Sequence, residues 1–91
     1  MAQVIIINPR DNVAVALRDL KKGETLLLPD GMELSILSEI PYSHKVALMD
    51  IPQGADVIKY GECIGETKVI VLKGDWIHTH NLDIGEKKEQ V

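Results

Sequence analysis

Residues 15–26 read Val-Ala-Leu-Arg-Asp-Leu-Lys-Lys-Gly-Glu-Thr-Leu, and residues 46–57 read Val-Ala-Leu-Met-Asp-Ile-Pro-Gln-Gly-Ala-Asp-Val. The two segments share the pattern Val-Ala-Leu-x-Asp-apolar-x-x-Gly-x-x-apolar, and residues 71–77 keep its apolar-x-x-Gly-acid-x-apolar part. Each copy predicts a strand, a turn closed by a glycine with positive φ, and a second strand. We interpret Gly23, Gly54 and Gly74 as turn formers and nothing more. The copies are too few and too short for a solenoid, so they indicate one small β domain.

The segments between the copies also favour strands. Residues 26–36 predict a strand, a turn at Pro29-Asp30-Gly31 and a second strand with alternating polarity. Residues 60–67 predict another strand, in which Gly61 and Gly65 indicate a bulge or a close approach of backbone to a neighbour. Helical periodicity is weak throughout the chain. We therefore expect a mainly β domain of about eight short strands joined in hairpins, with little helix.

Length, charge and cysteine content exclude several classes of protein. A chain of 91 residues fits one domain, and its net charge of −4 argues against nucleic acid or an anionic membrane as a partner. No apolar run approaches the roughly 18 residues of a membrane span. Cys63 is the only cysteine, so no intrachain disulfide forms and a cytoplasmic location is expected. We interpret Cys63 as a small buried hydrophobic residue rather than a nucleophile.

The most informative candidate site is residues 76–81, Trp-Ile-His-Thr-His-Asn. On an extended strand, His78 and His80 project from one face together with Trp76, about 7 Å apart along the strand. Two imidazoles on one face suit metal ligation, general acid–base chemistry or the binding of a carboxylate. The alternative is a structural or surface role.

Two further positions carry cations beside polar turns. His44 and Lys45 open the second copy of the repeat, and Lys59 precedes Tyr60 and Gly61. Each of these three is either a solvated surface group or a binding group for an anionic substrate. The sequence contains no Gly-rich phosphate loop, no zinc-spaced cysteine pair and no serine nucleophile elbow.

Three blocks of sequence follow one another in a characteristic order. They are residues 43–54 (Ser-His-Lys-Val-Ala-Leu-x-Asp-Ile-x-x-Gly), 57–65 (Val-Ile-Lys-Tyr-Gly-Glu-x-Ile-Gly) and 74–82 (Gly-Asp-Trp-Ile-His-Thr-His-Asn-Leu). In this order they resemble the SAF-type amino-terminal domain of the altronate and galactarate dehydratase family. The resemblance implies a β-clip (SAF-like) domain over residues 11–82, with residues 1–10 as an N-terminal strand or lead-in and residues 83–91 as a polar tail.

The resemblance also implies an activity. Enzymes of this family are hydro-lyases that remove water from a sugar acid such as altronate or galactarate by β-elimination, and they use a divalent metal, iron or manganese. Catalytic roles are implied for His78, His80 and His44, with His78 and His80 also as metal ligands. The groups implied to bind substrate are Lys45, Lys59 and Asn81.

Subunit organisation is a further implication of the resemblance. Some members are divided into a small subunit with this domain and a large subunit with the rest, and the small subunit of sulfolactate sulfo-lyase is organised in the same way. Because the chain ends soon after Asn81, we expect a small subunit that is active only with a large catalytic subunit. The alternatives are the sulfo-lyase subunit, a non-catalytic sugar-acid-binding module or a structural domain. A homo-oligomer is allowed for the chain in isolation.

Overall fold

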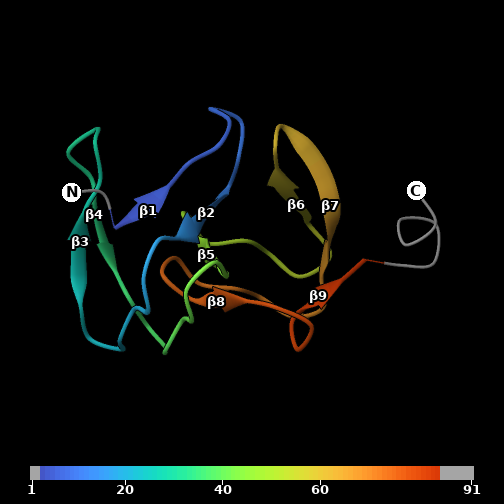
Figure 1. Cartoon of the computed structure of the whole chain (residues 1–91). Helices are drawn as coiled ribbons and strands as arrows, with labels where there is room; N and C mark the ends of the chain where they lie inside the picture. Colours follow the sequence, from blue (N-terminus) through green and yellow to red (C-terminus); the bar gives the residue numbers. More distant parts are fainter. Residues whose placement is uncertain (1–2, 85–91) are drawn as a thin grey trace.

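A computed structural model describes residues 3–84, and within that range every regular element is a β-strand (Figure 1). The mainly β class predicted from the sequence is confirmed. Nowhere in this range is there a helix with the length and apolar character needed to cross a membrane. The polar tail predicted for residues 83–91 lies outside the described residues from position 85 onward. The strands are β1 (Val4–Ile5), β2 (Val13–Ala16), β3 (Thr25–Leu27), β4 (Glu33–Ser35), β5 (Lys45–Ala47), β6 (Asp56–Lys59), β7 (Glu62–Thr67), β8 (Trp76–Ile77) and β9 (Leu82–Asp83).

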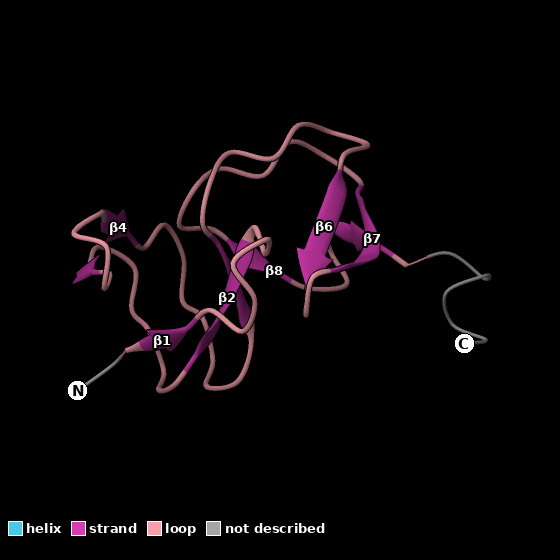
Figure 2. Ribbon diagram, turned by 90° about the horizontal axis from the view of Figure 1, so that it is seen from above, coloured by secondary structure: helices cyan, strands magenta, loops and turns pink. Residues whose placement is uncertain are grey.

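A four-stranded antiparallel sheet, in the order β1-β2-β5-β8, forms the centre of the domain. Its register places Ala14 opposite Val46, and Val46 opposite Trp76 on the next strand. The β3–β4 hairpin and the β6-β7-β9 sheet lie toward opposite ends of the molecule (Figure 1 and Figure 2). The central sheet therefore separates two smaller sheets.

Both faces of the central sheet contribute residues to a buried core. Successive side chains on a strand point to opposite faces. Ala14 and Val46 accordingly pack in a core with the β3–β4 hairpin, whereas Val13 and Ala47 pack in a second core with residues of β6 and β8. A strand buried on both faces needs apolar residues at every position, which accounts for the run Val-Ala-Val-Ala in β2.

Four turns of the same kind connect the strands, where the sequence pattern identified three. They span residues 20–24, 40–44, 51–55 and 71–75. In each, the amide of the fifth residue donates to the carbonyl of the second at 3.0–3.1 Å; the pairs are Glu24–Lys21, His44–Pro41, Ala55–Pro52 and Asp75–Leu72. The first turn pairs with the second and the third with the fourth, because isolated β-bridges join Leu20 to Ile40 and Ile51 to Val71. The sequence pattern did not identify the second turn, because Ser43 stands where the other three turns have glycine.

The aspartate of the repeat joins each pair of turns. The Oδ1 atom of Asp19 accepts a hydrogen bond from the Tyr42 amide at 2.8 Å, and Oδ1 of Asp50 accepts one from the Lys73 amide at 2.8 Å. Asp19 and Asp50 hold equivalent positions in the repeat, and Tyr42 and Lys73 hold equivalent positions in the facing turns. A carboxylate is a strong acceptor for a backbone N–H, which explains why both copies carry aspartate.

Backbone conformation at the fourth turn position is left-handed in all four turns. The φ angles are +94° at Gly23, +80° at Gly54, +92° at Gly74 and +71° at Ser43. For Gly23 and Gly54 the prediction of a simple turn former is confirmed, because an added Cβ would meet nothing within 4 Å. Gly74 does more, because a Cβ there would lie 1.7 Å from the Ser35 carbonyl oxygen. Only glycine lets this turn approach β4 so closely.

The β6–β7 hairpin confirms one prediction and corrects another. The strand register shifts between Val57 and Ile58, and a Cβ on Gly65 would lie 2.8 Å from the Asp83 carbonyl oxygen, as bulge or close approach predicts. Cys63, however, is exposed rather than buried. The reason is that β9 pairs with β7 only at Glu66 and Thr67, so the start of β7 pairs with β6 alone and has an uncovered edge.

Replacing Ser43 by Gly should stabilise the domain by up to about 1 kcal/mol, because a non-glycine residue with left-handed φ is strained. Gly54→Ala, at the equivalent and equally open position, should destabilise it by about 1 kcal/mol. Urea unfolding followed by circular dichroism measures both changes. Equal effects of the same sign would contradict this account of the turns.

Replacing Asp50 by Ala should lower the free energy of unfolding by about 1–2 kcal/mol, because the Lys73 amide loses its acceptor. Glu39→Ala is the matched control: Glu39 is exposed and makes no side-chain hydrogen bond within residues 3–84, so its loss should change stability by less than about 0.5 kcal/mol. The two variants are compared by thermal unfolding, and indistinguishable midpoints would refute the role given to Asp50.

Candidate functional site

Two strands of the central sheet bring the predicted site residues together. β5 begins at Lys45, directly after the turn at residues 40–44, and pairs with β8 so that Lys45 lies opposite Ile77. Continuing this antiparallel register by one step sets His44 against His78, and their ring centroids are 4.8 Å apart. Two histidines far apart in sequence thus become neighbours because of strand pairing.

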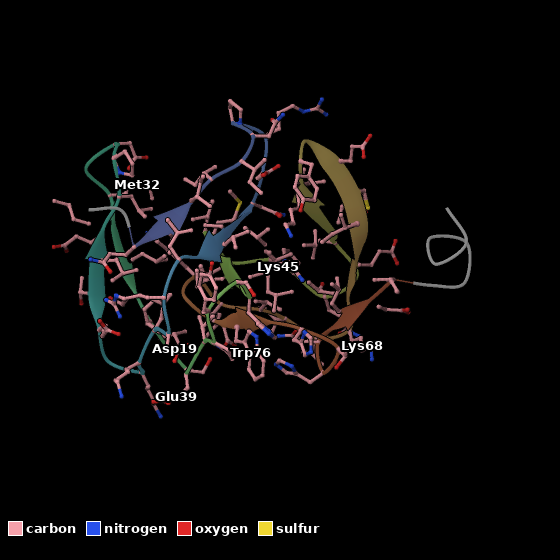
Figure 3. The ribbon with its side chains drawn as sticks, viewed as in Figure 1. Asp19, Met32, Glu39, Lys45, Lys68 and Trp76 are labelled. Carbon is pink, nitrogen blue, oxygen red and sulfur yellow. The ribbon has the colours of Figure 1, made fainter. Side chains whose placement is uncertain are left out.

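Trp76 lies in contact with all three histidines. Its ring centroid is 5.6 Å from that of His44, 5.4 Å from that of His78 and 5.2 Å from that of His80. The His78 ring stacks on the indole with an interplanar angle of 6°. We call these four residues the imidazole–indole cluster. Figure 3 shows Lys45 near the middle of the view and Trp76 below it, at the lower edge of the molecule.

The prediction of an extended strand through His78 and His80 is wrong. β8 ends at Ile77, and residues 78–81 form a turn in which the His78 carbonyl accepts hydrogen bonds from the amides of Asn81 and Leu82 at 3.1 and 2.9 Å. The turn, rather than strand alternation, brings His80 back to Trp76. The grouping of these rings was predicted, but its geometry was not.

Asn81 closes this turn from inside. Its side chain is only 3% exposed; Oδ1 accepts from the His78 amide at 2.9 Å, and Nδ2 donates to the Trp76 carbonyl at 2.8 Å. From outside, the Lys68 ammonium donates to the Thr79 carbonyl at 2.9 Å. The structure therefore places Asn81, proposed from sequence as a substrate-binding group, where it fixes the backbone on both sides of Ile77.

Lys45 lies close enough to the cluster for its charge to act on His78. Burial, followed by the nearby charge of Lys59, lowers the pKa of Lys45. Burial, followed by the charges of His44, Lys45 and His80, lowers the pKa of His78. The ammonium of Lys59 lies 4.7 Å from the centre of the Tyr60 ring. Within residues 3–84, no salt bridge joins Lys45, Lys59 or the three histidines to a carboxylate.

A metal centre does not fit the described residues by themselves. Among residues 3–84, no group of three or more His, Cys, Asp or Glu side chains is arranged to hold a metal ion. His78 and His80 would supply two imidazoles, and the charge of Lys45 beside His78 opposes a divalent cation. Iron and manganese sites in proteins usually include carboxylate ligands, which the cluster lacks.

The structure adds Trp76 and Ser43 to the residues singled out from the sequence. Trp76 was placed on the same face as the histidines, but the sequence assigned it no role. Its contact with His44 follows from the β5–β8 register, which the repeat pattern alone does not specify. Ser43 sets the strained turn that leads into His44.

Comparison with known proteins identifies the family of this domain. A family model described as "Altronate/galactarate dehydratase SAF domain" matches residues 2–85. The chain belongs to this family. The match includes β1, which pairs with β2 and buries Val4 in the core.

Curated relatives of this SAF domain are lyases. Galactarate dehydratase (L-threo-forming) of Escherichia coli (strain K12) is 44% identical over 75 residues, which is 80% of this chain and 14% of the relative. Altronate dehydratase of the same strain is 43% identical over 79 residues, 87% of this chain and 16% of the relative. (2R)-sulfolactate sulfo-lyase subunit alpha of Paracoccus pantotrophus is 44% identical over 48 residues, 53% of this chain and 72% of the relative. The chain thus spans only a small part of the two dehydratases.

Replacing Lys45 by Met should raise the pKa of His78, because one of the charges that lowers it disappears. The ring proton shifts of His78 in an NMR titration measure the change. Lys22→Met, at an exposed position in the first turn, is the control and should leave the pKa of His78 in place.

The stability of the fold should depend on the protonation of His78. Because folding lowers the pKa of His78 from 6.5, the unfolded chain binds more protons as the pH falls through that value, and this group then destabilises the fold. The loss of stability on acidification should be smaller in Lys45→Met than in Lys22→Met. Identical pH profiles of the two variants would show that Lys45 does not act on His78.

Proposed function

We propose that this SAF domain is the small subunit of a carbon–oxygen lyase that eliminates water from a sugar acid, and that it presents a cationic surface to the substrate carboxylate. The observation that carries the proposal is a set of neighbouring cationic and imidazole groups without a carboxylate partner in residues 3–84. Lys45 is half-buried near Lys59, and its burial and the Lys59 charge both disfavour its protonated form. Such an arrangement weakens folding and favours an anionic ligand.

The relatives support this class of substrate. Galactarate, altronate and sulfolactate, which the names of the relatives specify, are all hydroxy acids with a carboxylate. The feature that these substrates share is the carboxylate group, and the feature that the relatives share with this chain is the SAF domain. Similarity extends over more of the chain for the dehydratases than for the sulfo-lyase, which favours a sugar acid over sulfolactate.

The reaction we assign is β-elimination. A base takes the proton α to the carboxylate, the C–H electron pair forms the C=C bond, and the β-hydroxyl leaves as water with a proton from an acid. His78 suits the base, because a lowered pKa keeps its imidazole neutral near pH 7. Lys45 and Lys59 suit the binding of the carboxylate and the stabilisation of the enediolate that develops from it. His80, exposed on the turn, suits proton donation.

A partner polypeptide completes the site in this proposal. The dehydratase relatives are far longer than this chain, and the alpha subunit of the sulfo-lyase is by its name one of several subunits. We assign the partner a large catalytic part of the lyase and place the complex in the cytoplasm. The iron or manganese ion implied by the family would need further ligands from that partner, and the steps above do not depend on it.

The test is to assay formation of 2-keto-3-deoxy acid from galactarate and altronate by the chain assembled with a large dehydratase subunit. His78→Ala should reduce kcat by about 100-fold or more, as expected for loss of a general base. Lys45→Met should mainly raise KM, while Lys22→Met should change neither constant.

Two outcomes would defeat parts of this proposal. Equal turnover by the large subunit alone would remove the chain from the reaction. A loss confined to KM in both His78→Ala and Lys45→Met would make the domain a sugar-acid-binding module with the chemistry located elsewhere.

A further inference from the structure

One hydrogen bond inside the imidazole–indole cluster determines which nitrogen of the His44 ring carries the proton. The Nε1 atom of Trp76 donates to Nδ1 of His44 at 3.1 Å. An indole N–H is a donor only, so Nδ1 of His44 must present a lone pair. A neutral His44 then carries its proton on Nε2, and this N–H has no hydrogen-bond partner within residues 3–84.

Trp76 is held firmly enough to impose this choice. Its amide donates to Oδ1 of Asp75 at 2.9 Å, and its carbonyl accepts from the Asn81 side chain at 2.8 Å. Its side chain packs against the core that includes Val46, the residue opposite it on β5. The indole is therefore fixed before any ligand arrives.

His44 is held from a different part of the chain. Its amide donates to the Pro41 carbonyl at 3.1 Å, and its carbonyl accepts from the Ala16 amide at 2.9 Å. The two partners of the ring hydrogen bond are separated by 32 residues, so tertiary structure and not local sequence sets the contact. The His78 ring stacks on the face of the same indole, whereas His44 accepts the hydrogen bond from the indole N–H. The two histidines therefore interact with Trp76 in different ways.

We propose that Trp76 is a positioning residue that fixes His44 in the Nε2–H tautomer and so makes it a hydrogen-bond donor to the substrate carboxylate. The role of the donor rests on the proposed function, whereas the tautomer does not. In this arrangement the lone pair of His44 is engaged by the indole, so His44 does not remove the α-proton. Its N–H instead binds a carboxylate oxygen, and the base role stays with His78.

The tautomer is tested in the ligand-free 91-residue chain, labelled with ¹⁵N, at a pH where its imidazoles are neutral. A long-range ¹H–¹⁵N spectrum should show a pyridine-like Nδ1 and a pyrrole-like Nε2 for His44. A coupling across the hydrogen bond between Trp76 Nε1 and His44 Nδ1 should also be visible. A protonated Nδ1, or the tautomer mixture of a free imidazole together with no such coupling, would overturn the proposal without any variant being made.

Trp76→Phe keeps an aromatic ring but removes the donor, so His44 should shift toward a mixture of tautomers. In the assembled lyase the same change should raise KM for galactarate about tenfold, which is the lower end of the effect of losing a group that orients a metal-binding histidine. His44→Ala should raise KM at least as much, and adding Trp76→Phe to it should change KM little further.

Additive effects in this double-mutant cycle would show that Trp76 acts through packing and not through His44, which would overturn the positioning role. His44→Gln, which offers an amide N–H near the place of Nε2, should retain more affinity than His44→Ala, and the reverse order would contradict the donor role. If the assembled protein has no dehydratase activity while the tautomer is found as expected, the proposed function fails and the assignment of the His44 tautomer stands.

Discussion

The hydrogen bond from the Lys73 amide to the Asp50 carboxylate, across the bridge between Ile51 and Val71, is the constraint on which the site depends. It sets the fourth turn against the third, and the Gly74 amide then reaches the Ala47 carbonyl at 2.8 Å. From that contact β8 continues in register along β5. His44 and His78 become neighbours at the end of that register, so a hydrogen bond between residues 23 apart in sequence sets the distance between two functional rings.

The same hydrogen bond occurs twice, and both copies lead to residues of the imidazole–indole cluster. Asp19 holds the second turn as Asp50 holds the fourth, and the turns that receive these bonds lead into His44 and into Trp76. The turns that contain Gly23 and Gly54 instead lead into strands of the two outer sheets. The first and third turns thus lead to the outer sheets that cover the central sheet. The second and fourth turns place the residues of the cluster.

The sequence predicted the mainly β class because turn residues and small apolar residues recur in register, and such patterns depend on local backbone preferences. It also grouped Trp76, His78 and His80, although it placed them on a straight strand. The turn at residues 78–81 was missed because its closing group is a buried asparagine, which from sequence resembles an exposed binding residue. Exposure of Cys63 was missed for a similar reason, since the length of β7 that projects past β9 is a tertiary property. The contact of His44 with Trp76 depends on strand pairing, which one sequence does not specify.

Trp76 is the only tryptophan in the chain, and three imidazoles surround it. Indole emission responds to the polarity and charge of its surroundings and can be excited apart from the two tyrosines. The intrinsic fluorescence of the unlabelled protein therefore originates within the cluster itself. Arrival of an anion beside these rings would change the emission directly, so the domain carries an optical reporter at the place where its ligand is proposed to bind.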